Sequence, residues 1–414
     1  MSDLQPVRGT HDLMPEDLRR HRRVTETACE IAARYGYQEI STPIFEFTEV
    51  FQRTLGETSD IVTKEMYTFE DRSGDGITLR PEVTAGVARA FISGGLAQHL
   101  PLKFFCRGPM FRYERPQKGR QRQFHQVDVE LLGVPEPLGD VEIILLGAHV
   151  LDALGVADHV TLELNTLGDR ESRKAYRAKL VAYLEKRIDE LSADSRARLT
   201  RNPLRVFDSK DRGDKKVIAD APLLTDHLND ASKDFFVDVR RGLDGAGVAY
   251  EVNPRLVRGL DYYCHAAFEF TTETLGAQGA VLAGGRYDGL IEAMGGPPTP
   301  ATGWAAGVER LALMIADPPA PPRPIAVVPV GDEAGSPALA VAQRLRRAGF
   351  SADLGFSGNL KKRLARADKA GAAAAVILGS DELERESATV RDMVSGKQTE
   401  VPLSSLEDHL ARYR

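Results

Sequence analysis

A basic segment at residues 111–126 is the part of the chain best suited to chemistry. It carries five cations and one carboxylate, and a hairpin of this composition can hold a polyphosphate. It runs into residues 126–132, where polar and apolar side chains alternate as they do along a strand. The polar set, which shares one face, is Gln126, Asp128 and Glu130. The sequence therefore predicts a site that holds a nucleotide beside a cationic or amine-bearing small molecule.

A second polar cluster lies at residues 78–84. Glu82 and Thr84 are two positions apart, so they point the same way if the segment is extended. Together they could bind an ammonium group and a neighbouring polar atom. The alternative is a strand end with ordinary surface polar residues.

A third cluster, at residues 256–263, joins an arginine to a turn and two aromatic rings. Gly259 allows the backbone to turn tightly, so that Arg258 can reach into a cleft. Tyr262 and Tyr263 add stacking surface and hydroxyl donors. The alternative is a turn with a surface arginine and core tyrosines.

Two further clusters are rich in glycine. Gly284 and Gly285 permit close approach of the backbone to a ligand, or form a simple turn. Residues 303–311 lead into a helix whose apolar positions are Val308, Leu311, Ala312 and Ile315. Arg310 lies off that apolar stripe near the helix start, where an anion is stabilised. With the other clusters present, we expect a phosphate ligand there rather than a plain surface arginine.

The elements that must position these residues fall into two regions. Many prolines at 317–324 predict a stiff spacer between a body of about 320 residues and a tail of about 90. In the body we expect a helix at 15–35, a strand at 37–44 interrupted by Pro43, a long helix at 171–191 and a strand at 266–272. Residues 170–250 are rich in helix and are predicted to be an insertion between two halves of a catalytic sheet.

The tail is expected to be a small α/β domain. Strands are predicted at 325–330, 351–356, 374–378, 389–393 and 399–402, and helices at 337–348 and 360–370. A capping box at residues 404–407 predicts a last helix. The cations of residues 359–369 are either a nucleic-acid patch or a solvated helix face.

Composition limits the class of protein. The chain has 414 residues, of which 42% are hydrophobic and 28% charged, with no apolar run long enough for a membrane span and no apparent secretory signal. Its net charge of −6 argues against a general nucleic-acid coat protein, although local basic patches could bind one. Three distant cysteines offer neither a zinc spacing nor a disulfide framework, so a cytoplasmic location is the simplest expectation.

Taken together, these clusters resemble the class II aminoacyl-tRNA synthetases, and specifically the histidyl-tRNA synthetase family. Residues 41–46, 111–114 and 307–310 are similar to the three class II motifs, the first of which builds the dimer interface. Residues 258–263 and 284–288 are similar to the two histidine-specific motifs, which are highly specific in this order. One departure is Trp304, where the family leads us to expect a smaller aromatic residue.

The resemblance implies a fold, partners and a reaction. The expected fold is an α/β (α+β) chain with a class II antiparallel-sheet catalytic domain at 1–320, a helical insertion at about 170–250, and an anticodon-binding α/β domain at 325–414. The implied substrates are L-histidine, ATP with Mg²⁺ on its outer phosphates, and tRNA(His). A cytoplasmic homodimer without a membrane segment is implied, and no editing domain is evident.

The resemblance also implies roles for single residues. Glu82 and Thr84 should hold the α-amino end of histidine, and Glu130 and Tyr263 its imidazole side. Arg112 and Arg258 should be the catalytic residues, flanking the ATP α-phosphate. The full set implied for histidine is Glu82, Thr84, Arg112, Gln126, Glu130, Arg258, Tyr262 and Tyr263. The set implied for ATP is Arg112, Glu114 at the adenine end, Phe124 stacked on the base, and Arg120 and Arg310 on the distal phosphates.

We expect Arg115 to read the tRNA acceptor end, because it is placed beside the predicted site on the basic hairpin. The alternative is a generic phosphate contact. The closest rival is a histidine-sensing regulatory subunit that resembles the same catalytic body. That kind of protein typically lacks the tail and loses catalytic arginines. Here the tail is present, and so are Arg112, Arg258 and Arg310.

Overall fold

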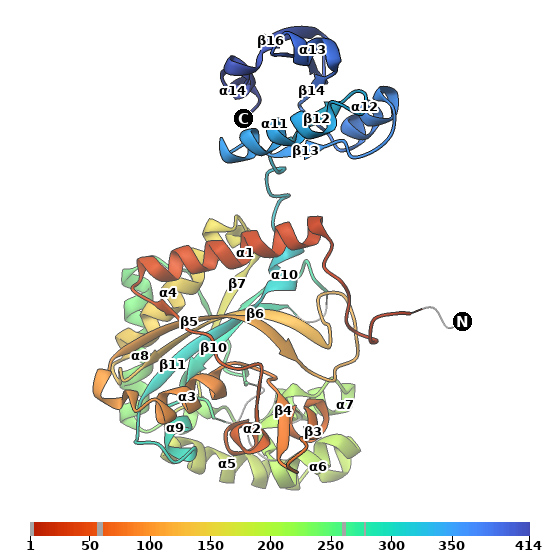
Figure 1. Ribbon diagram of the computed structural model, residues 1–414. Coiled ribbons are helices and arrows are strands. Elements are labelled where there is room, and N and C mark those ends of the chain that lie inside the picture. Colours follow the sequence, from red (N-terminus) through yellow and green to blue (C-terminus); the bar gives the residue numbers. More distant parts are fainter. Residues whose placement is uncertain (1–3, 56–60, 259–261, 277–278) are drawn as a thin grey trace. The chain divides into compact units, whose positions relative to one another are not determined.

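The computed structural model describes residues 4–55, 61–258, 262–276 and 279–414. The chain forms two compact units, Met1–Pro318 and Pro319–Arg414, and each is described by itself (Figure 1). The division falls inside the proline-rich segment. Within the described ranges, no helix is long and apolar enough to cross a membrane.

The first unit is built on an eight-stranded sheet with the order β1-β5-β6-β11-β10-β9-β7-β8. Its inner pairs are antiparallel, and only the terminal pairs β1–β5 and β7–β8 are parallel. The strands are β1 (Gln38–Glu39), β5 (Leu102–Phe111), β6 (Gln123–Leu132), β7 (Thr161–Thr166), β8 (Glu251–Val252), β9 (Cys264–Thr271), β10 (Ala280–Arg286) and β11 (Ala301–Gly307). The predicted antiparallel-sheet fold class is confirmed.

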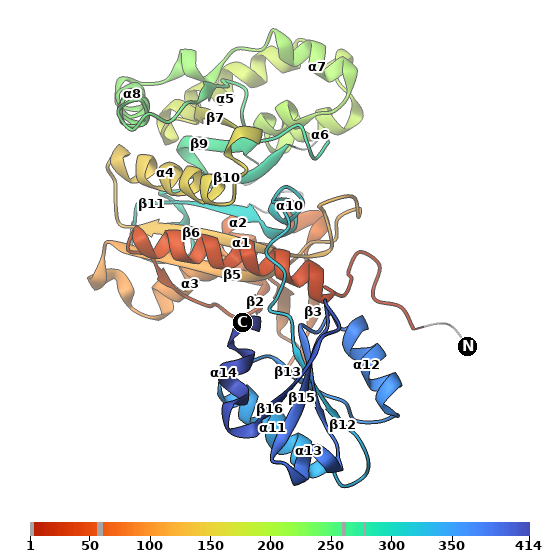
Figure 2. The ribbon, with the colours of Figure 1, turned by 90° about the horizontal axis from the view of Figure 1, so that it is seen from above.

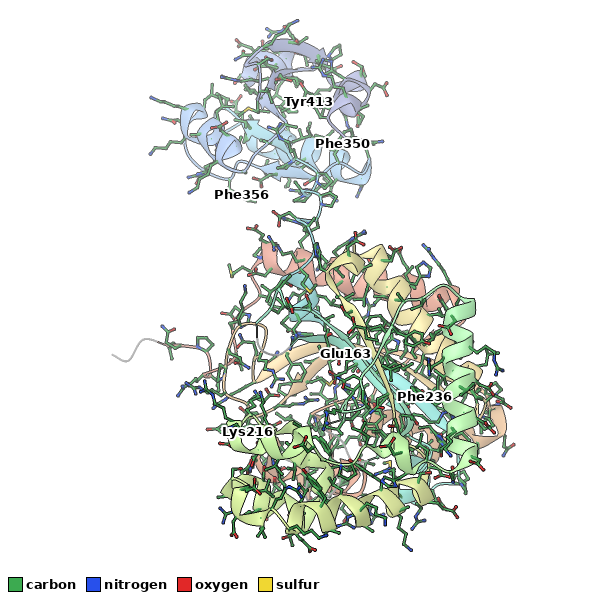
Figure 3. The ribbon with its side chains drawn as sticks, turned by 180° about the vertical axis from the view of Figure 1, so that it is seen from behind. Glu163, Lys216, Phe236, Phe350, Phe356 and Tyr413 are labelled. Atoms are coloured by element: carbon green, nitrogen blue, oxygen red, sulfur yellow. The ribbon has the colours of Figure 1, made fainter. Side chains whose placement is uncertain are left out.

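One face of this sheet is covered by four helices, α1 (Pro15–Arg34), α4 (Pro137–Ala153), α8 (Asp230–Gly245) and α10 (Val308–Ala312). Figure 2 shows α1 and α4 lying over it, and Phe236, labelled in Figure 3, comes from α8. The apolar set predicted for β6 enters this core, because alternate strand residues share a face. It consists of Val127, Val129 and Leu131.

The opposite face carries α3 (Thr84–Ser93), α9 (Leu290–Ala293) and α2 (Thr48–Leu55) with a separate three-stranded sheet. That sheet has the order β2-β4-β3, from Phe45–Phe47, Gly76–Leu79 and Tyr67–Glu70. The predicted strand at 37–44 is therefore wrong in extent. Only Gln38–Glu39 pairs with β5, and the chain leaves for the other sheet at Pro43, which has no N–H to donate.

The helix-rich segment lies between β7 and β9 and contains α5 (Arg170–Glu185), α6 (Ala193–Arg201), α7 (Arg212–Ala219) and α8. The predicted helix at 171–191 ends early, because the chain turns after Glu185 so that Leu191 joins Leu180 and Leu184 in a small helical core. In contrast, α8 packs on α4 in the main core.

The second unit is a five-stranded sheet of order β13-β12-β14-β15-β16 with flanking helices, as predicted. The strands are β12 (Ile325–Pro329), β13 (Ala352–Leu354), β14 (Ala374–Leu378), β15 (Ser387–Asp392) and β16 (Gln398–Pro402), and the helices are α11 (Gly335–Arg347), α12 (Leu360–Lys369), α13 (Ser380–Glu384) and α14 (Leu406–Leu410). The predicted last helix is present, but the predicted capping box is wrong: α14 starts after a 3₁₀ turn at Leu403–Ser405, and its N-cap residue Ser405 makes no side-chain capping hydrogen bond.

Candidate active site

A cavity of about 330 Å³ lies in the first unit and gathers nearly all the predicted site residues. Two of them are not in its lining: Glu130, which lies behind it, and Arg115, which is exposed on the hairpin loop. Those that line it are Glu82, Thr84, Arg112, Glu114, Arg120, Phe124, Gln126, Arg258, Tyr262, Tyr263 and Arg310. Gly259–Asp261 of the third cluster lie outside the described residues.

Glu82 reaches the cavity from a helix start and not from a strand. Its carboxylate accepts hydrogen bonds from the backbone N–H of Thr84 (2.7 Å) and of Ala85 (2.9 Å), the first two residues of α3. The extended geometry assumed for residues 82–84 is therefore wrong, because free N–H groups at a helix start attract a carboxylate. The two side chains still line one cavity. Burial raises the pKa of Glu82.

Glu130 is a fully enclosed carboxylate at 1% exposure. It accepts a hydrogen bond from the Thr84 hydroxyl (2.5 Å) and another from the Tyr287 hydroxyl. Burial raises its pKa to about 8. The cavity therefore meets Glu130 through Thr84 and Tyr287, both of which line it.

Glycine at position 303 makes the Glu130–Tyr287 contact possible. Gly303 pairs with Glu130 across β11 and β6, and a Cβ there would lie 2.0 Å from Oε2 of Glu130. A side chain is excluded at Gly284 as well, since a Cβ added there would lie 2.2 Å from the Gly303 carbonyl oxygen and 2.5 Å from Trp304 Cβ. Gly284 therefore permits close approach between strands, and it is not in the cavity lining.

Trp304 fits its position well. It is 2% exposed, and its indole N–H donates to the Ile143 carbonyl at 2.9 Å. The packing before the third class II motif is therefore intact. Arg286, beside the paired glycines, is an anchor within the fold: it is fully buried and pairs with Asp140 on α4.

Arg258 and Arg112 enter the cavity with fixed orientations. Arg258 pairs with Glu269, and its guanidinium lies 5.2 Å from the Tyr263 ring centre. Arg112 donates from Nε to the Pro81 carbonyl at 2.8 Å. Because Arg guanidinium groups match phosphate geometry, two held in one cavity suit a phosphate between them.

The hairpin supplies the other cations. Arg112 lies 5.2 Å from the Phe124 ring centre, and Arg120 pairs with Glu114 at 2.7 Å. Burial, and then the nearby Arg120 charge, lower the pKa of Arg310. Two cations that disfavour each other in one cavity are stabilised by an anion.

One group of potential metal ligands occurs among the described residues: His21, His125 and Glu309, whose donor atoms lie within 4.8 Å of one another. Both Glu309 oxygens already accept from the backbone N–H of His125 at 2.9 Å, and the His125 ring contacts Oε1 at 2.8 Å. This geometry ties β6 to α10 and α1 and gives no reason to place a metal there.

Three residues that line the cavity have no role predicted from the sequence: Asp128, Glu269 and Tyr287. Asp128 had been placed on the correct face of its strand, and Tyr287 lies inside a cluster already noted. No sequence signal marked Glu269, since its partner Arg258 is eleven positions earlier across a turn.

The cavity lining as a whole combines carboxylates with arginines. The carboxylates suit an amine, and the arginines suit phosphates. Such a cavity can hold an amino acid and a nucleotide with the reacting groups adjacent.

Comparisons with known proteins agree with the family resemblance seen in the sequence. The sequence model described as histidyl-tRNA synthetase matches residues 9–311, and that described as anticodon binding domain matches residues 324–413. The chain is 61% identical to the histidine–tRNA ligase of Rhodospirillum rubrum over 414 residues, covering 100% of both chains, and 56% identical to that of Gluconacetobacter diazotrophicus, covering 99% of both. It resembles the crystal structure of apo S. aureus histidyl-tRNA synthetase with a TM-score of 0.82 and 35% identity, covering 98% of this chain and 99% of that one.

Proposed function

The chain belongs to the histidyl-tRNA synthetase family, and we propose which of its residues carry out the reaction. It is a class II aminoacyl-tRNA synthetase that charges tRNA(His) with histidine at the expense of ATP, through a histidyl-adenylate. The observation that carries the proposal is the single cavity in which buried carboxylates and arginines meet.

Histidine occupies the part of the cavity lined by Glu82, Thr84 and Gln126. Glu82, with Thr84 beside it, faces the α-ammonium group, and Gln126 lies next to the amino acid on β6. Tyr263 and Glu130, the latter acting through its hydrogen-bonded neighbours, set the imidazole side. An amino acid without ring nitrogens would leave these polar groups unpaired, which supports strong discrimination without editing.

ATP occupies the part of the cavity lined by Phe124, Arg120 and Arg310. Phe124 stacks on the base and Glu114 contacts the adenine end, while Arg120 and Arg310 hold the distal phosphates. The lowered pKa of Arg310 beside Arg120 supports this placement, since a phosphate would relieve both charges. Phosphate binding would require Arg120 to exchange part of its contact with Glu114.

Magnesium accompanies the outer phosphates of ATP. Glu269 is a carboxylate in the lining, and an oxygen donor of this kind fits Mg²⁺. Bound there, the ion would neutralise charge on the leaving pyrophosphate.

The first step is attack of the histidine carboxylate on the α-phosphorus of ATP, with release of pyrophosphate. The carboxylate is already ionised, so this step needs no general base. Arg112 and Arg258 flank the α-phosphate and stabilise charge on its oxygens, commonly by about 3 kcal/mol per group. In the second step a ribose hydroxyl at the tRNA 3′ end attacks the acyl carbon and AMP leaves, with a phosphate oxygen of the adenylate as base.

The tRNA is held at several places in our proposal. Arg115 on the hairpin loop contacts the acceptor end, and the C-terminal anticodon-binding domain contacts the anticodon. A second cavity, of about 970 Å³, shares Tyr262 with the first and is lined by four cations of α5, which supports a role for the insertion in holding the tRNA end. They are Arg170, Arg173, Lys174 and Arg177. Unchanged tRNA affinity in a Lys174→Glu/Arg177→Glu variant would contradict that role.

We also propose a cytoplasmic homodimer. Four large apolar side chains are exposed at the first class II motif and the small sheet beside it, and such a patch commonly marks an interface. They are Ile44, Phe45, Phe47 and Phe69. A monomeric mass in analytical ultracentrifugation at micromolar concentration would contradict the dimer.

The free cysteines suit a reducing compartment. The catalytic domain is assigned to residues 1–320 and the anticodon-binding domain to 325–414.

The test is ATP–pyrophosphate exchange with each of the twenty amino acids, without tRNA. Exchange with histidine alone is expected. Histidine binding without exchange would instead indicate a regulatory protein, and exchange with another amino acid would contradict the assigned pocket.

A further inference from the structure

Asp128 lies on β6 between Gln126 and Glu130, and it lines the cavity. It is 1% exposed, so water does not solvate its carboxylate. Its Oδ2 atom receives no hydrogen bond from any described residue. A buried carboxylate in this state is costly unless a partner or a proton compensates for its charge.

The other carboxylates of the cavity region are already engaged. Glu82 accepts two backbone N–H groups, and Glu130 accepts two hydroxyl groups. Glu114 and Glu269 each pair with an arginine. Asp128 therefore differs from these carboxylates in having a buried oxygen that receives no hydrogen bond from a described residue.

The arginines near Asp128 do not supply this partner. Arg80 donates to the Pro109 carbonyl at 2.9 Å and to the Thr42 carbonyl at 3.0 Å, while Arg112 donates to the Pro81 carbonyl. Their charges lower the pKa of Asp128, but burial, followed by the nearby Glu130 and Glu82 charges, raises it well above the ordinary value. A cation entering the cavity beside Asp128 would favour the ionised carboxylate and so lower that pKa.

The substrates differ in what they can bring to this position. ATP brings anions, which Asp128 would repel. Histidine brings one compact cation, its α-ammonium group, with three N–H donors. We propose that Asp128 accepts a hydrogen bond from the α-ammonium group of histidine, beside Glu82, and so distinguishes α-amino acids from analogues that lack the amine. The inference rests on the proposed function, because it takes histidine as the occupant.

The test compares ligands that differ in the amine. Asp128→Asn keeps the shape of the side chain and removes its charge. Calorimetric Kd values are measured for histidine, for histidinol, which keeps the amine and lacks the carboxylate, and for 3-(imidazol-4-yl)propionate, which lacks the amine. Charged hydrogen bonds of this kind predict a roughly 10- to 100-fold weaker Kd for histidine and histidinol, with little change for imidazolepropionate.

Equal losses for all three ligands would overturn the proposal, because Asp128 would then act on the fold or the imidazole. Unchanged histidine binding would also overturn it. Glu142→Gln is the matched control: Glu142 pairs with Lys103 and is not in the cavity lining, so all three Kd values should hold.

A measurement on the unaltered protein covers the case in which Asp128→Asn does not fold. Calorimetry at neutral pH in two buffers of different ionisation enthalpy counts protons released on binding. Histidine should release more protons than imidazolepropionate, after correction for each ligand's own titration, and equal release would contradict the proposal. Exchange with histidine in the unaltered protein tests the proposed function separately, so the two failures are distinguishable.

Discussion

Tyr287, just after β10, donates its hydroxyl hydrogen to Glu130 on β6, across the intervening strand β11. The two residues are 157 positions apart in sequence. Their contact passes over Gly303, where a side chain would occupy the space of the carboxylate. The imidazole side of the proposed pocket therefore depends on three strands at once.

Removing this hydroxyl should weaken histidine recognition without affecting ATP. Tyr287→Phe leaves Glu130 with one donor, so we expect the KM for histidine in ATP–pyrophosphate exchange to rise about tenfold. The KM for ATP should stay constant. Tyr37→Phe is the control, since Tyr37 also donates to a carboxylate, Glu142, but is not in the cavity lining. A rise in both KM values for Tyr287→Phe would indicate general damage to the site.

The raised pKa of Glu130 predicts how stability changes with pH. Its pKa moves from 4.5 to about 8, so between these values the folded chain holds a proton that the unfolded chain has lost. The resulting contribution of Glu130 to the free energy of unfolding is complete below pH 4.5 and is lost as pH rises through 8. Glu130→Gln has no such group. As pH rises from 4.5 to about 8, the free energy of unfolding of Glu130→Gln should therefore increase relative to that of the unaltered chain, by up to about 1.4 kcal/mol per pH unit.

Urea unfolding of both proteins at pH 5.5, 6.5, 7.5 and 8.5 measures the difference. Buried acids that both proteins share, such as Glu82, contribute nearly equally to the two free energies of unfolding, so their contributions largely cancel in the difference. Parallel curves would mean that Glu130 is ionised throughout.

The Arg286–Asp140 pair should matter for stability. Both side chains are fully buried, and Arg286 also donates to the Val134 carbonyl at 2.9 Å. Arg286→Met leaves Asp140 buried without its partner, which should cost about 3–5 kcal/mol in the free energy of unfolding. The exposed pair Arg241–Asp238 provides the control, and Arg241→Met should change stability by less than about 0.5 kcal/mol. Similar effects of the two changes would refute the anchoring role.

Arg258 should affect the chemical step. Arg258→Ala removes a guanidinium from the proposed α-phosphate site, so kcat for exchange should fall about 10²- to 10³-fold. Arg258→Lys should recover only part of the loss, because a point charge does not reproduce the guanidinium fork. Arg107→Ala, at an exposed pair with Glu39, serves as the control. A change confined to the KM for ATP would assign Arg258 to ground-state binding.

Arg115 should act on tRNA alone. Arg115→Ala is expected to leave exchange unchanged and to lower aminoacylation most for the cognate acceptor end. The exposed Lys118 in the same loop controls for charge, since Lys118→Ala should weaken every tRNA variant alike. If Arg115→Ala also weakened all acceptor-end variants equally, specific readout would be wrong.

Local patterns predicted much of the fold and of the site. The alternation along β6, the first helix and the tail strands follow from periodicities of two and 3.6 residues, which neighbouring residues carry. The pattern could not show that Glu82 caps α3, since that depends on where the helix begins. Nor could it show that Arg286 anchors the fold or that a buried oxygen of Asp128 receives no hydrogen bond from a described residue. Both depend on partners that only the folded sheet brings close.

The position of β11 in the sheet has a consequence for synthesis of the chain. This strand is the last of the eight to be made, yet it lies in the middle, between β6 and β10 (Figure 1). Until residue 307 has emerged from the ribosome, the earlier strands can form only two separate sheets, each with an open edge where β11 will insert. A nascent chain that stops short of β11 should thus be prone to aggregate and to require chaperones, and it should bind neither substrate.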